Sequence, residues 1–187
     1  QNDPVTVTAT SGPVDMVGAT IDSTSGSVTV EGSSVTATDV SVTAPNDAVS
    51  VTATGGLADV SRMSVDSTSG VVTLRGETVV ATNADIDGQN DDIEVSARER
   101  GGGPLDVTGL AATTANGDIV LESTGDVTLD AAELRSTNGQ ATAALGRGSA
   151  TLSVDEAVVA DTDDTLTSDP NGVSVSGTTS AGSVSKN

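Results

Sequence analysis

One ten-residue phrase recurs along this chain, and its spacing is the strongest constraint on the fold. The phrase has the form apolar-x-small-x-[SN]-[GD]-x-apolar-x-apolar, and residues 65–74, VDSTSGVVTL, give a clear example. Copies begin at residues 7, 21, 42, 65, 86, 112, 134 and 166, so most steps are close to 22 residues. A near-constant period of this length is typical of repeat architectures, in which each repeat packs mainly against its neighbours.

Each copy is predicted to form a strand, a tight turn and a second strand. Positions 5 and 6 of the phrase are Ser-Gly, Asn-Asp, Asn-Gly or a close variant, and these residues tolerate left-handed backbone conformations. Positions 1, 8 and 10 are nearly always aliphatic, and the period of two in a strand predicts that they face inward. A second apolar patch lies between copies, as at Val35 and Val40, so one repeat should supply about three short strands.

Two all-β architectures fit this pattern. The favoured one is a parallel β-solenoid (β-helix) of about eight coils near 22 residues each, with equivalent residues stacked about 4.8 Å apart. The alternative is an antiparallel β-sandwich or jelly roll in which each phrase is a hairpin, because Asn-Gly between alternating apolar residues is a strong hairpin signal. In the solenoid, position 5 would form a polar ladder along one corner: Ser11, Ser25, Asn46, Ser69, Asn90, Asn116, Asn138 and Asn171.

The composition favours strands around a thin core. The 187-residue chain has no Phe, Tyr or Trp, so Val, Ile, Leu and Ala have to fill its interior. Its 27 valines and 28 threonines are β-branched and suit pleated sheets. We expect a single domain over residues 1–187, with residues 1–160 as its main body and residues 161–187 as an acidic turn and a C-terminal strand segment.

The net charge of −20 restricts the partners of this chain. Its 27 acidic residues face six Arg and one Lys, so it lacks the basic surface that binding to nucleic acid or anionic lipid requires. Molar salt would screen the self-repulsion, because the Debye length falls to about 3 Å at 1 M. The scarcity of Lys beside abundant Asp, Ala, Val and Thr resembles the composition of proteins from salt-loving archaea.

The sequence gives few signals about location. No run of 18 apolar residues is present, so we expect no membrane insertion. The chain starts at Gln1 rather than Met, and we expect an extracellular or cell-surface location after removal of a signal peptide. A cytoplasmic scaffold is the alternative.

Catalysis is not expected. Without His or Cys, the chain lacks the general base of a Ser-His-Asp or Cys-His site, and its one lysine, Lys186, lies next to the last residue. Carboxylate pairs for glycoside hydrolysis are abundant, but the aromatic platforms that sugar sites normally offer are missing. Arg98 and Arg100 form the one basic cluster, which we interpret as part of an exposed loop between coils. We predict a non-enzyme with no catalytic residues.

Two acidic clusters are candidate calcium sites, because Ca²⁺ prefers carboxylate and amide oxygens. The first consists of Asp85, Asp87, Asn90, Asp91 and Asp92. The second consists of Asp161, Asp163, Asp164 and Asp169, with Asn171 beside them. Neither matches the EF-hand pattern or the GGxGxD calcium roll, so the alternative is a solvated face of an acidic protein.

Three phrases carry a family resemblance: STSGVVTLRG, TANGDIVLESTGDVTLDAAEL and STNGQATAALG. They resemble the repeat-type adhesin family of bacteria and archaea. They are similar, less closely, to the bactofilins, which are polymer-forming β-helical cytoskeletal proteins. The chain departs from bactofilins in its acidity and in starting without Met. Neither family contributes a catalytic residue, and the resemblance implies a structural, self-associating role.

We therefore expect a non-catalytic subunit of a filament or layer that assembles with copies of itself through strand-edge or end-to-end contacts. A solenoid finishes in unpaired strand edges, and both PVTVTAT near the start and NGVSVSGTTSAGSVS near the end remain strand-like. One alternative is an adhesion or binding module with a surface-layer or other cell-surface partner and a dependence on Ca²⁺. The other is an intracellular scaffold similar to the bactofilins.

Overall fold

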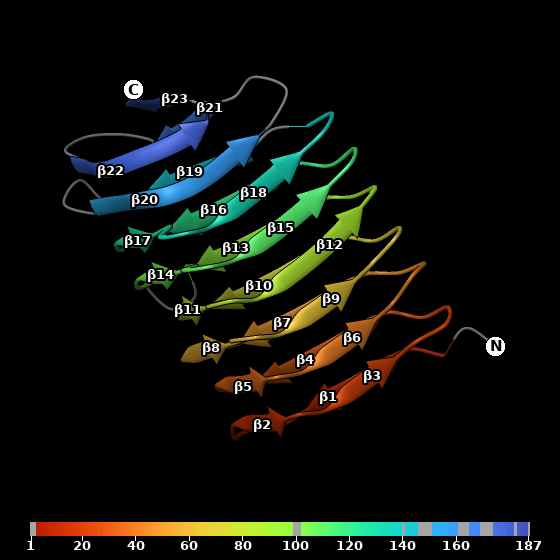
Figure 1. Cartoon of the computed structure of the whole chain (residues 1–187). Helices are drawn as coiled ribbons and strands as arrows, with labels where there is room; N and C mark the ends of the chain where they lie inside the picture. The colour runs from red at the N-terminus through yellow and green to blue at the C-terminus, as the bar shows by residue number, and fades with distance from the viewer. Residues whose placement is uncertain are drawn as a thin grey trace.

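In the computed structural model the chain winds into a parallel β-solenoid. The structure describes residues 3–98, 102–139, 141–145, 151–160, 165–168, 174–181 and 183–186, with side chains described up to residue 143, and these residues form strands and turns without a helix. Each coil contributes three strands, so the solenoid has three faces that run along its length (Figure 1). The first coil lies at one end of the stack, and the C-terminal strands lie at the other.

The three faces are defined by their strands. The first face consists of β1 (Val5–Thr8), β4 (Val28–Gly32), β7 (Val49–Ala53), β10 (Val72–Gly76), β13 (Ile93–Ala97), β16 (Ile119–Ser123) and β19 (Ala141–Leu145). The second consists of β2 (Val14–Val17), β5 (Val35–Thr38), β8 (Leu57–Asp59), β11 (Thr78–Val80), β14 (Leu105–Asp106) and β17 (Val127–Thr128). The third consists of β3 (Thr20–Asp22), β6 (Ser41–Thr43), β9 (Ser64–Asp66), β12 (Asp85–Gln89), β15 (Ala111–Thr114) and β18 (Glu133–Ser136).

Four further strands continue the stack at the C-terminal end. The long strand β20 (Thr151–Ala160) pairs with both β17 and β18, and so joins the second and third faces into one sheet. On its other side β20 pairs with β22 (Ser174–Ala181). Strand β21 (Thr165–Ser168) pairs with β23 (Ser183–Lys186).

The ladder of strand pairs confirms the solenoid and excludes the hairpin sandwich. Every strand pair among the described residues is parallel, whereas hairpins would give antiparallel pairs. The turn at Ser69-Gly70 leads from β9 on the third face to β10 on the first face, which is the next wall of the coil. Val65, Val72 and Leu74 are buried, as the phrase predicts.

Six of the eight phrases stack in one column. Position 1 of these phrases pairs from coil to coil on the third face, through Ile21, Val42, Val65, Ile86, Ala112 and Leu134. The phrase at residue 7 differs, because Val7 lies on the first face and pairs with Val30. The turn of the phrase at residue 166 lies outside the described residues. The described residues therefore form six complete three-strand coils, followed by β19 to β23.

The coil length alternates along the chain. Registered residues of the first face are Val5, Val28, Val49, Val72, Ile93, Ile119 and Ala141, and the successive steps are 23, 21, 23, 21, 26 and 22 residues. In the longest step, β13 ends at Ala97 and β14 begins at Leu105, so more residues separate these strands than at the same corner of the other coils. The register of the first face is kept across this step, because β13 pairs with both β10 and β16.

The core is a thin aliphatic column between the three faces. Inward residues of the strands are almost entirely excluded from solvent, with Val28, Val49 and Leu74 at 0 % exposure. The largest fully buried side chains are Met63 and a set of leucines and isoleucines. Because the three walls approach closely, small branched side chains fill the space that an aromatic ring would overfill.

One corner requires a left-handed backbone in every complete coil. The residues at the corner between the second and third faces all have φ between 53° and 66°: Gly18, Asp39, Arg62, Asn83, Gly109 and Ala131. The amide of each of the first five donates a hydrogen bond to a carbonyl in the next coil, for example Gly109 N to Asp130 O at 2.8 Å. Only glycine adopts this conformation without steric cost, so four of the six coils have a strained residue there.

The corner between the third and first faces occurs in two forms. Where position 6 of the phrase is glycine, position 3 is a buried Ser or Thr: Ser23 with Gly26, Ser67 with Gly70, Thr114 with Gly117 and Ser136 with Gly139. Where position 6 is Asp47 or Asp91, position 3 is Ala44 or Gly88 instead. The hydroxyl bonds to the backbone of the glycine turn, whereas Asp91 N donates to Gly88 O at 3.1 Å in the second form.

Replacing Ala131 by glycine is expected to stabilise the protein. The left-handed conformation costs a non-glycine residue about 1–2 kcal/mol, and glycine removes this cost. The larger conformational entropy that glycine loses on folding offsets about 0.5–1 kcal/mol of that stabilisation. The expected net increase in the free energy of unfolding is about 0.5–1 kcal/mol, measured by urea denaturation followed by far-UV circular dichroism. The control is Ala115→Gly, at a turn residue without positive φ, which should lower stability. Equal destabilisation by both would contradict the assignment of strain to Ala131.

Candidate functional site

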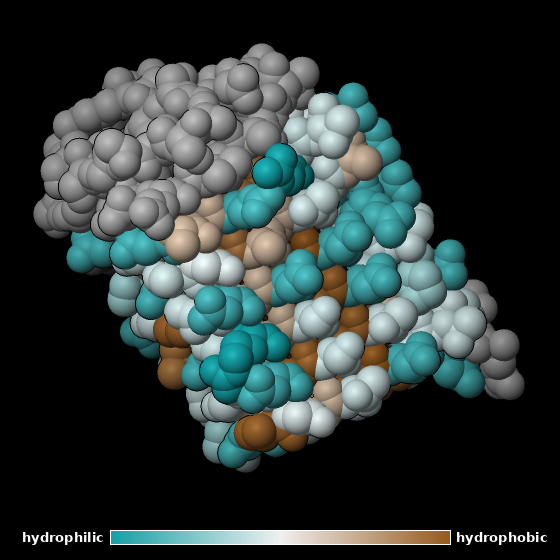
Figure 2. Space-filling model, viewed as in Figure 1, coloured by the Kyte–Doolittle hydropathy of each residue, from teal (hydrophilic) through white to brown (hydrophobic). Residues whose placement is uncertain are grey.

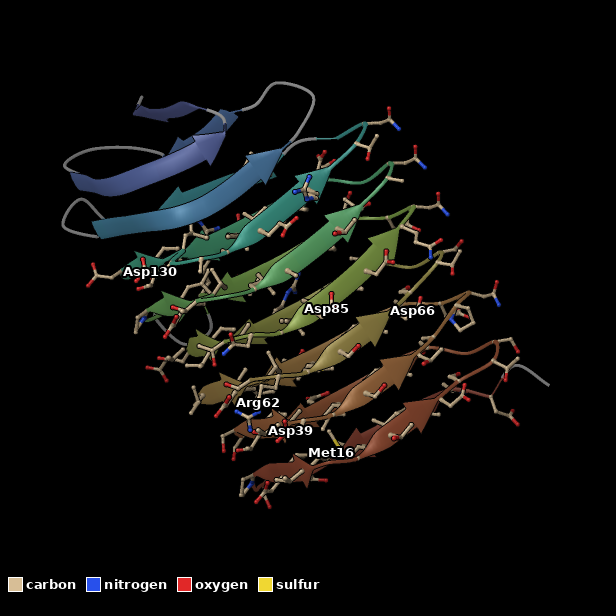
Figure 3. The ribbon with its side chains drawn as sticks, viewed as in Figure 1. Met16, Asp39, Arg62, Asp66, Asp85 and Asp130 are labelled. Atoms are coloured by element: carbon tan, nitrogen blue, oxygen red, sulfur yellow. The ribbon has the colours of Figure 1, made fainter. Side chains whose placement is uncertain are left out.

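The first predicted calcium cluster is divided between two surfaces. Asp85 and Asp87 project outward from β12 on the third face, where Asp87 is in register with Asp66 of β9 (Figure 3). Asp87 Oδ1 accepts a hydrogen bond from the amide of Gln89 at 3.2 Å. Asp87 and Asp66 are thus like-charged neighbours along the solenoid axis, whereas Asp85 is in register with the uncharged Ser64.

The other three members lie in the turn that follows β12. Asn90 donates from Nδ2 to the carbonyl of Thr68 in the preceding coil at 2.8 Å. Asp92 Oδ1 accepts a hydrogen bond from the amide of Asp118 in the next coil at 2.8 Å. Asp91 contributes its backbone carbonyl as an acceptor for Thr114 Oγ1 at 3.1 Å. Each of the three is therefore used to connect neighbouring coils.

The described residues contain no group of three or more acidic side chains placed to hold a metal ion. The second cluster, Asp161, Asp163, Asp164 and Asp169 with Asn171, lies outside the described residues. Calcium binding by either cluster therefore stays a prediction.

The predicted polar ladder follows the corner between the third and first faces. Asn116 Nδ2 donates to Asn90 Oδ1 at 2.8 Å, and Asn138 Nδ2 donates to Asn116 Oδ1 at 3.0 Å. Asn46 bonds instead to the carbonyl of Thr24 in the coil before it, at 3.1 Å. Ser11 is not part of this corner, because it lies between β1 and β2, and Asn171 lies outside the described residues.

Every arginine whose side chain the structure describes is paired with a carboxylate. Arg75 donates from Nη2 to both carboxylate oxygens of Glu94, at 2.9 and 2.8 Å, and Arg98 Nη1 lies 3.0 Å from Glu122 Oε2. Arg135 pairs with Glu133 on β18. The predicted basic cluster is therefore reduced to an ion pair at Arg98, while Arg100 lies outside the described residues.

The fourth pair, Asp39 with Arg62, connects adjacent coils at the left-handed corner. Arg62 Nε lies 2.6 Å from Asp39 Oδ1, and Nη2 lies 2.8 Å from Oδ2 (Figure 3). Hydrogen bonding from Arg62, aided by its positive charge, lowers the pKa of Asp39 below the ordinary 3.8, and the same bond raises the pKa of Arg62. This pair is not among the residues predicted from the sequence, although its separation of 23 residues is one coil length and opposite charges one coil apart are a usable signal.

The N-terminal end of the stack exposes part of the core. Val5 and Val7 are only half-buried, whereas their registered partners Val28 and Val30 in the second coil are at 0 % exposure. Met16 of β2 is likewise only half-buried, whereas its registered partner Ala37 is at 0 % exposure. Strands β1, β2 and β3 each have one partner among the described strands, in the second coil, so their other edges are open.

The visible face of the solenoid is polar over the described residues. Figure 2 shows teal and white residues in rows across the coils, with brown apolar residues visible between them. The described part of the chain holds no helix that is long and apolar enough to cross a membrane.

Comparison of the chain with protein-family models, curated proteins and solved structures found no match.

Relieving the like-charge contact on the third face should stabilise the protein at low salt. Asp87→Asn keeps the oxygen that accepts from Gln89 but removes the charge facing Asp66, for an expected gain of a few tenths of a kcal/mol. The control is Asp22→Asn, because the registered partner of Asp22 is the uncharged Thr43. In molar salt the advantage of Asp87→Asn should disappear. If Asp87 instead binds Ca²⁺, added Ca²⁺ will raise the melting temperature of the wild type and not that of Asp87→Asn.

The Asp39–Arg62 pair should be visible in an acid titration. Because the pKa of Asp39 is lowered on folding, the pair stabilises the folded state above the unfolded pKa and loses this effect as the pH falls through the folded value, below 3.8. Carboxyl-carbon NMR should show Asp39 titrating below 3.8 in the wild type and at a higher pH in Arg62→Gln. Both side chains are about half exposed, so molar salt should reduce the difference. Arg75→Gln is the control and should leave the titration of Asp39 unchanged.

Proposed function

We propose that this chain is a non-catalytic structural subunit that assembles head to tail with copies of itself. The observation that carries the proposal is the in-register stacking of the coils, because a further coil of the same kind would bury the inward residues of the first coil as those of the following coils are buried. A surface of this kind is covered most completely by another coil of the same shape.

The partner at this end is a second copy of this chain, because the first coil presents the same inward side chains and backbone groups that each later coil covers on the coil before it. The second coil covers the first with Val28 over Val5 and Val30 over Val7, and the third coil covers the second in the same way with Val49 and Val51. Any coil presented in this register would meet the first coil with matching side-chain columns and matching backbone groups. Exposed strand edges of this type are templates for strand addition.

The parallel stack gives such an assembly a direction. All coils have the same strand order and the same chain direction, so the two ends of the solenoid differ, and one end can pair only with the opposite end of a neighbour. The pairing of β20 with β22 continues the parallel arrangement toward the C-terminal end. Each copy would then bind the next through unlike ends. Such a contact repeats from copy to copy and gives a filament unless a rotation between copies closes it into a ring.

The charge sets the conditions under which assembly is expected. Two copies that each carry a net charge of −20 repel one another at low ionic strength. In molar salt this repulsion is screened within about 3 Å, and the apolar and backbone contacts at the ends then dominate. We extend the proposal to the cell-surface or extracellular location that the sequence leads us to expect.

Electron microscopy and light scattering at high salt test the proposal. The purified chain should form filaments one solenoid wide, with a mass that rises with protein concentration. A monodisperse monomer at every concentration and salt level would contradict self-assembly.

A proline substitution tests whether the open edge of β1 is the contact. The amides of Val5 and Ala9 donate to the second coil. Successive amides of a strand point to opposite edges, so the amide of Thr8 points toward the open edge. Thr8→Pro removes this donor while leaving the bonds to the second coil, and proline is tolerated at such edge positions. We expect Thr8→Pro to reduce filament formation at least tenfold at a similar melting temperature, and Thr8→Val to assemble as the wild type does. Unimpaired assembly of Thr8→Pro would exclude this edge.

A further inference from the structure

Two turns of the solenoid contain the dipeptide Asn-Gly within the described residues. They are Asn116-Gly117 and Asn138-Gly139, at the corner between the third and first faces. In flexible chains this dipeptide is chemically labile. The glycine backbone nitrogen attacks the asparagine side-chain carbon Cγ, a C–N bond forms, ammonia leaves, and the resulting succinimide is opened by water to aspartate or isoaspartate. Glycine makes the attack easy, because it has no side chain to hinder the approach.

The stacking of coils requires glycine at both positions. A Cβ atom at Gly117 would collide with the backbone of Asp91 in the preceding coil. At Gly139 it would collide with the carbonyl of Gly117 and lie 2.6 Å from Asp118 Oδ1. The fold therefore cannot avoid the reactive dipeptide by placing a larger residue after either asparagine.

In the folded chain the attacking nitrogen is engaged in a hydrogen bond. Gly117 N donates to Thr114 Oγ1 at 3.0 Å, and Gly139 N donates to Ser136 Oγ at 2.9 Å. Both glycines and both hydroxyls are buried. The hydroxyls are held in turn by carbonyls of the preceding coil, since Thr114 Oγ1 donates to Asp91 O at 3.1 Å and Ser136 Oγ donates to Gly117 O at 2.7 Å.

The amide group that would be attacked is also held. Asn116 Nδ2 donates to Asn90 Oδ1, and Asn138 Nδ2 donates to Asn116 Oδ1 and to Ala115 O, the last at 2.8 Å. These bonds direct each side-chain amide along the solenoid axis toward the preceding coil. Cyclisation requires the side chain to turn back onto the amide of its own next residue, so the ladder has to break first.

We propose that Asn116 and Asn138 are latent modification sites, at which the buried hydroxyls of Thr114 and Ser136 and the asparagine ladder prevent succinimide formation while the coils stay stacked. Both asparagines are exposed, so water can reach them and the block lies in the conformation. Deamidation at these positions then reports the opening of the corner. This inference is independent of the proposed self-assembly.

At this corner, the buried hydroxyl at position 3 of the phrase occurs with glycine at position 6, whether position 5 is serine or asparagine. Ser67 bonds to Gly70 O at 3.0 Å in a turn of sequence Ser69-Gly70, which contains no asparagine. The first role of the hydroxyl is thus to satisfy the backbone of the glycine turn, and protection of a neighbouring asparagine is a consequence. This makes Ser67→Ala a matched control, because it removes an equivalent hydroxyl from the same column without touching an Asn-Gly site.

The experiment measures deamidation by peptide mass spectrometry during incubation at pH 8 and high salt. The variants are Ser136→Ala and Thr114→Val, compared with the wild type, with Ser67→Ala and with the wild type unfolded in urea. In the folded wild type, both sites should react at least tenfold more slowly than in the unfolded chain. Loss of the hydroxyl that binds the glycine nitrogen should accelerate the adjacent site about tenfold, Asn138 in Ser136→Ala and Asn116 in Thr114→Val.

Two results would overturn the proposal. One is equal deamidation of the folded and unfolded wild type at Asn116 and Asn138. The other is a Ser136→Ala protein that stays folded by circular dichroism and shows no acceleration at Asn138 beyond that in Ser67→Ala. The comparison with Ser67→Ala separates local protection from a general loss of stability, because both variants remove a buried hydroxyl from the same column.

Discussion

The in-register stacking of parallel coils is the constraint on which the rest of this structure depends. Hydrogen-bonded strands lie about 4.8 Å apart, so each residue of one coil sits directly over its counterpart in the next. At this distance a corner residue has room for little more than backbone, and Gly117 and Gly139 are therefore fixed as glycine. The same closeness lets Asn90, Asn116 and Asn138 bond to one another, and it makes Asp66 and Asp87 repel.

Much of the fold follows from the spacing of one phrase. The near-constant period and the aliphatic positions identified the parallel solenoid, the inward faces of Val65, Val72 and Leu74, and the corner ladder. The phrase at residue 7 does not stack with the others, because a Val/Thr-rich strand matches the same loose pattern on any face. The left-handed corner was not predicted, since Asp39, Arg62 and Ala131 are residues for which positive φ is unfavourable. There the stacking of whole coils overrides local preference.

The candidate sites were less accessible to sequence reasoning than the fold. Acidic residues that are close in sequence, such as Asp87 and Asp91, separate when β12 ends and the chain turns a corner. Residues about one coil apart come together instead, which is why Asp39 meets Arg62 and Asp92 meets Asp118. In a solenoid, the separation along the chain that brings side chains together is therefore close to one coil length.

The alternation of the coils has a consequence for how such a chain changes in length. Steps of 23 and 21 residues alternate over the first four coils, and the Ser-Gly and Asn-Asp corners alternate with them, so Val28 and Val72 occupy equivalent places 44 residues apart. Two coils, rather than one, are thus the unit that repeats in detail. Duplication or deletion of a 44-residue segment preserves the alternation of both corner and coil length, and a single-coil change disrupts it. The first four coils are thus two copies of a two-coil unit.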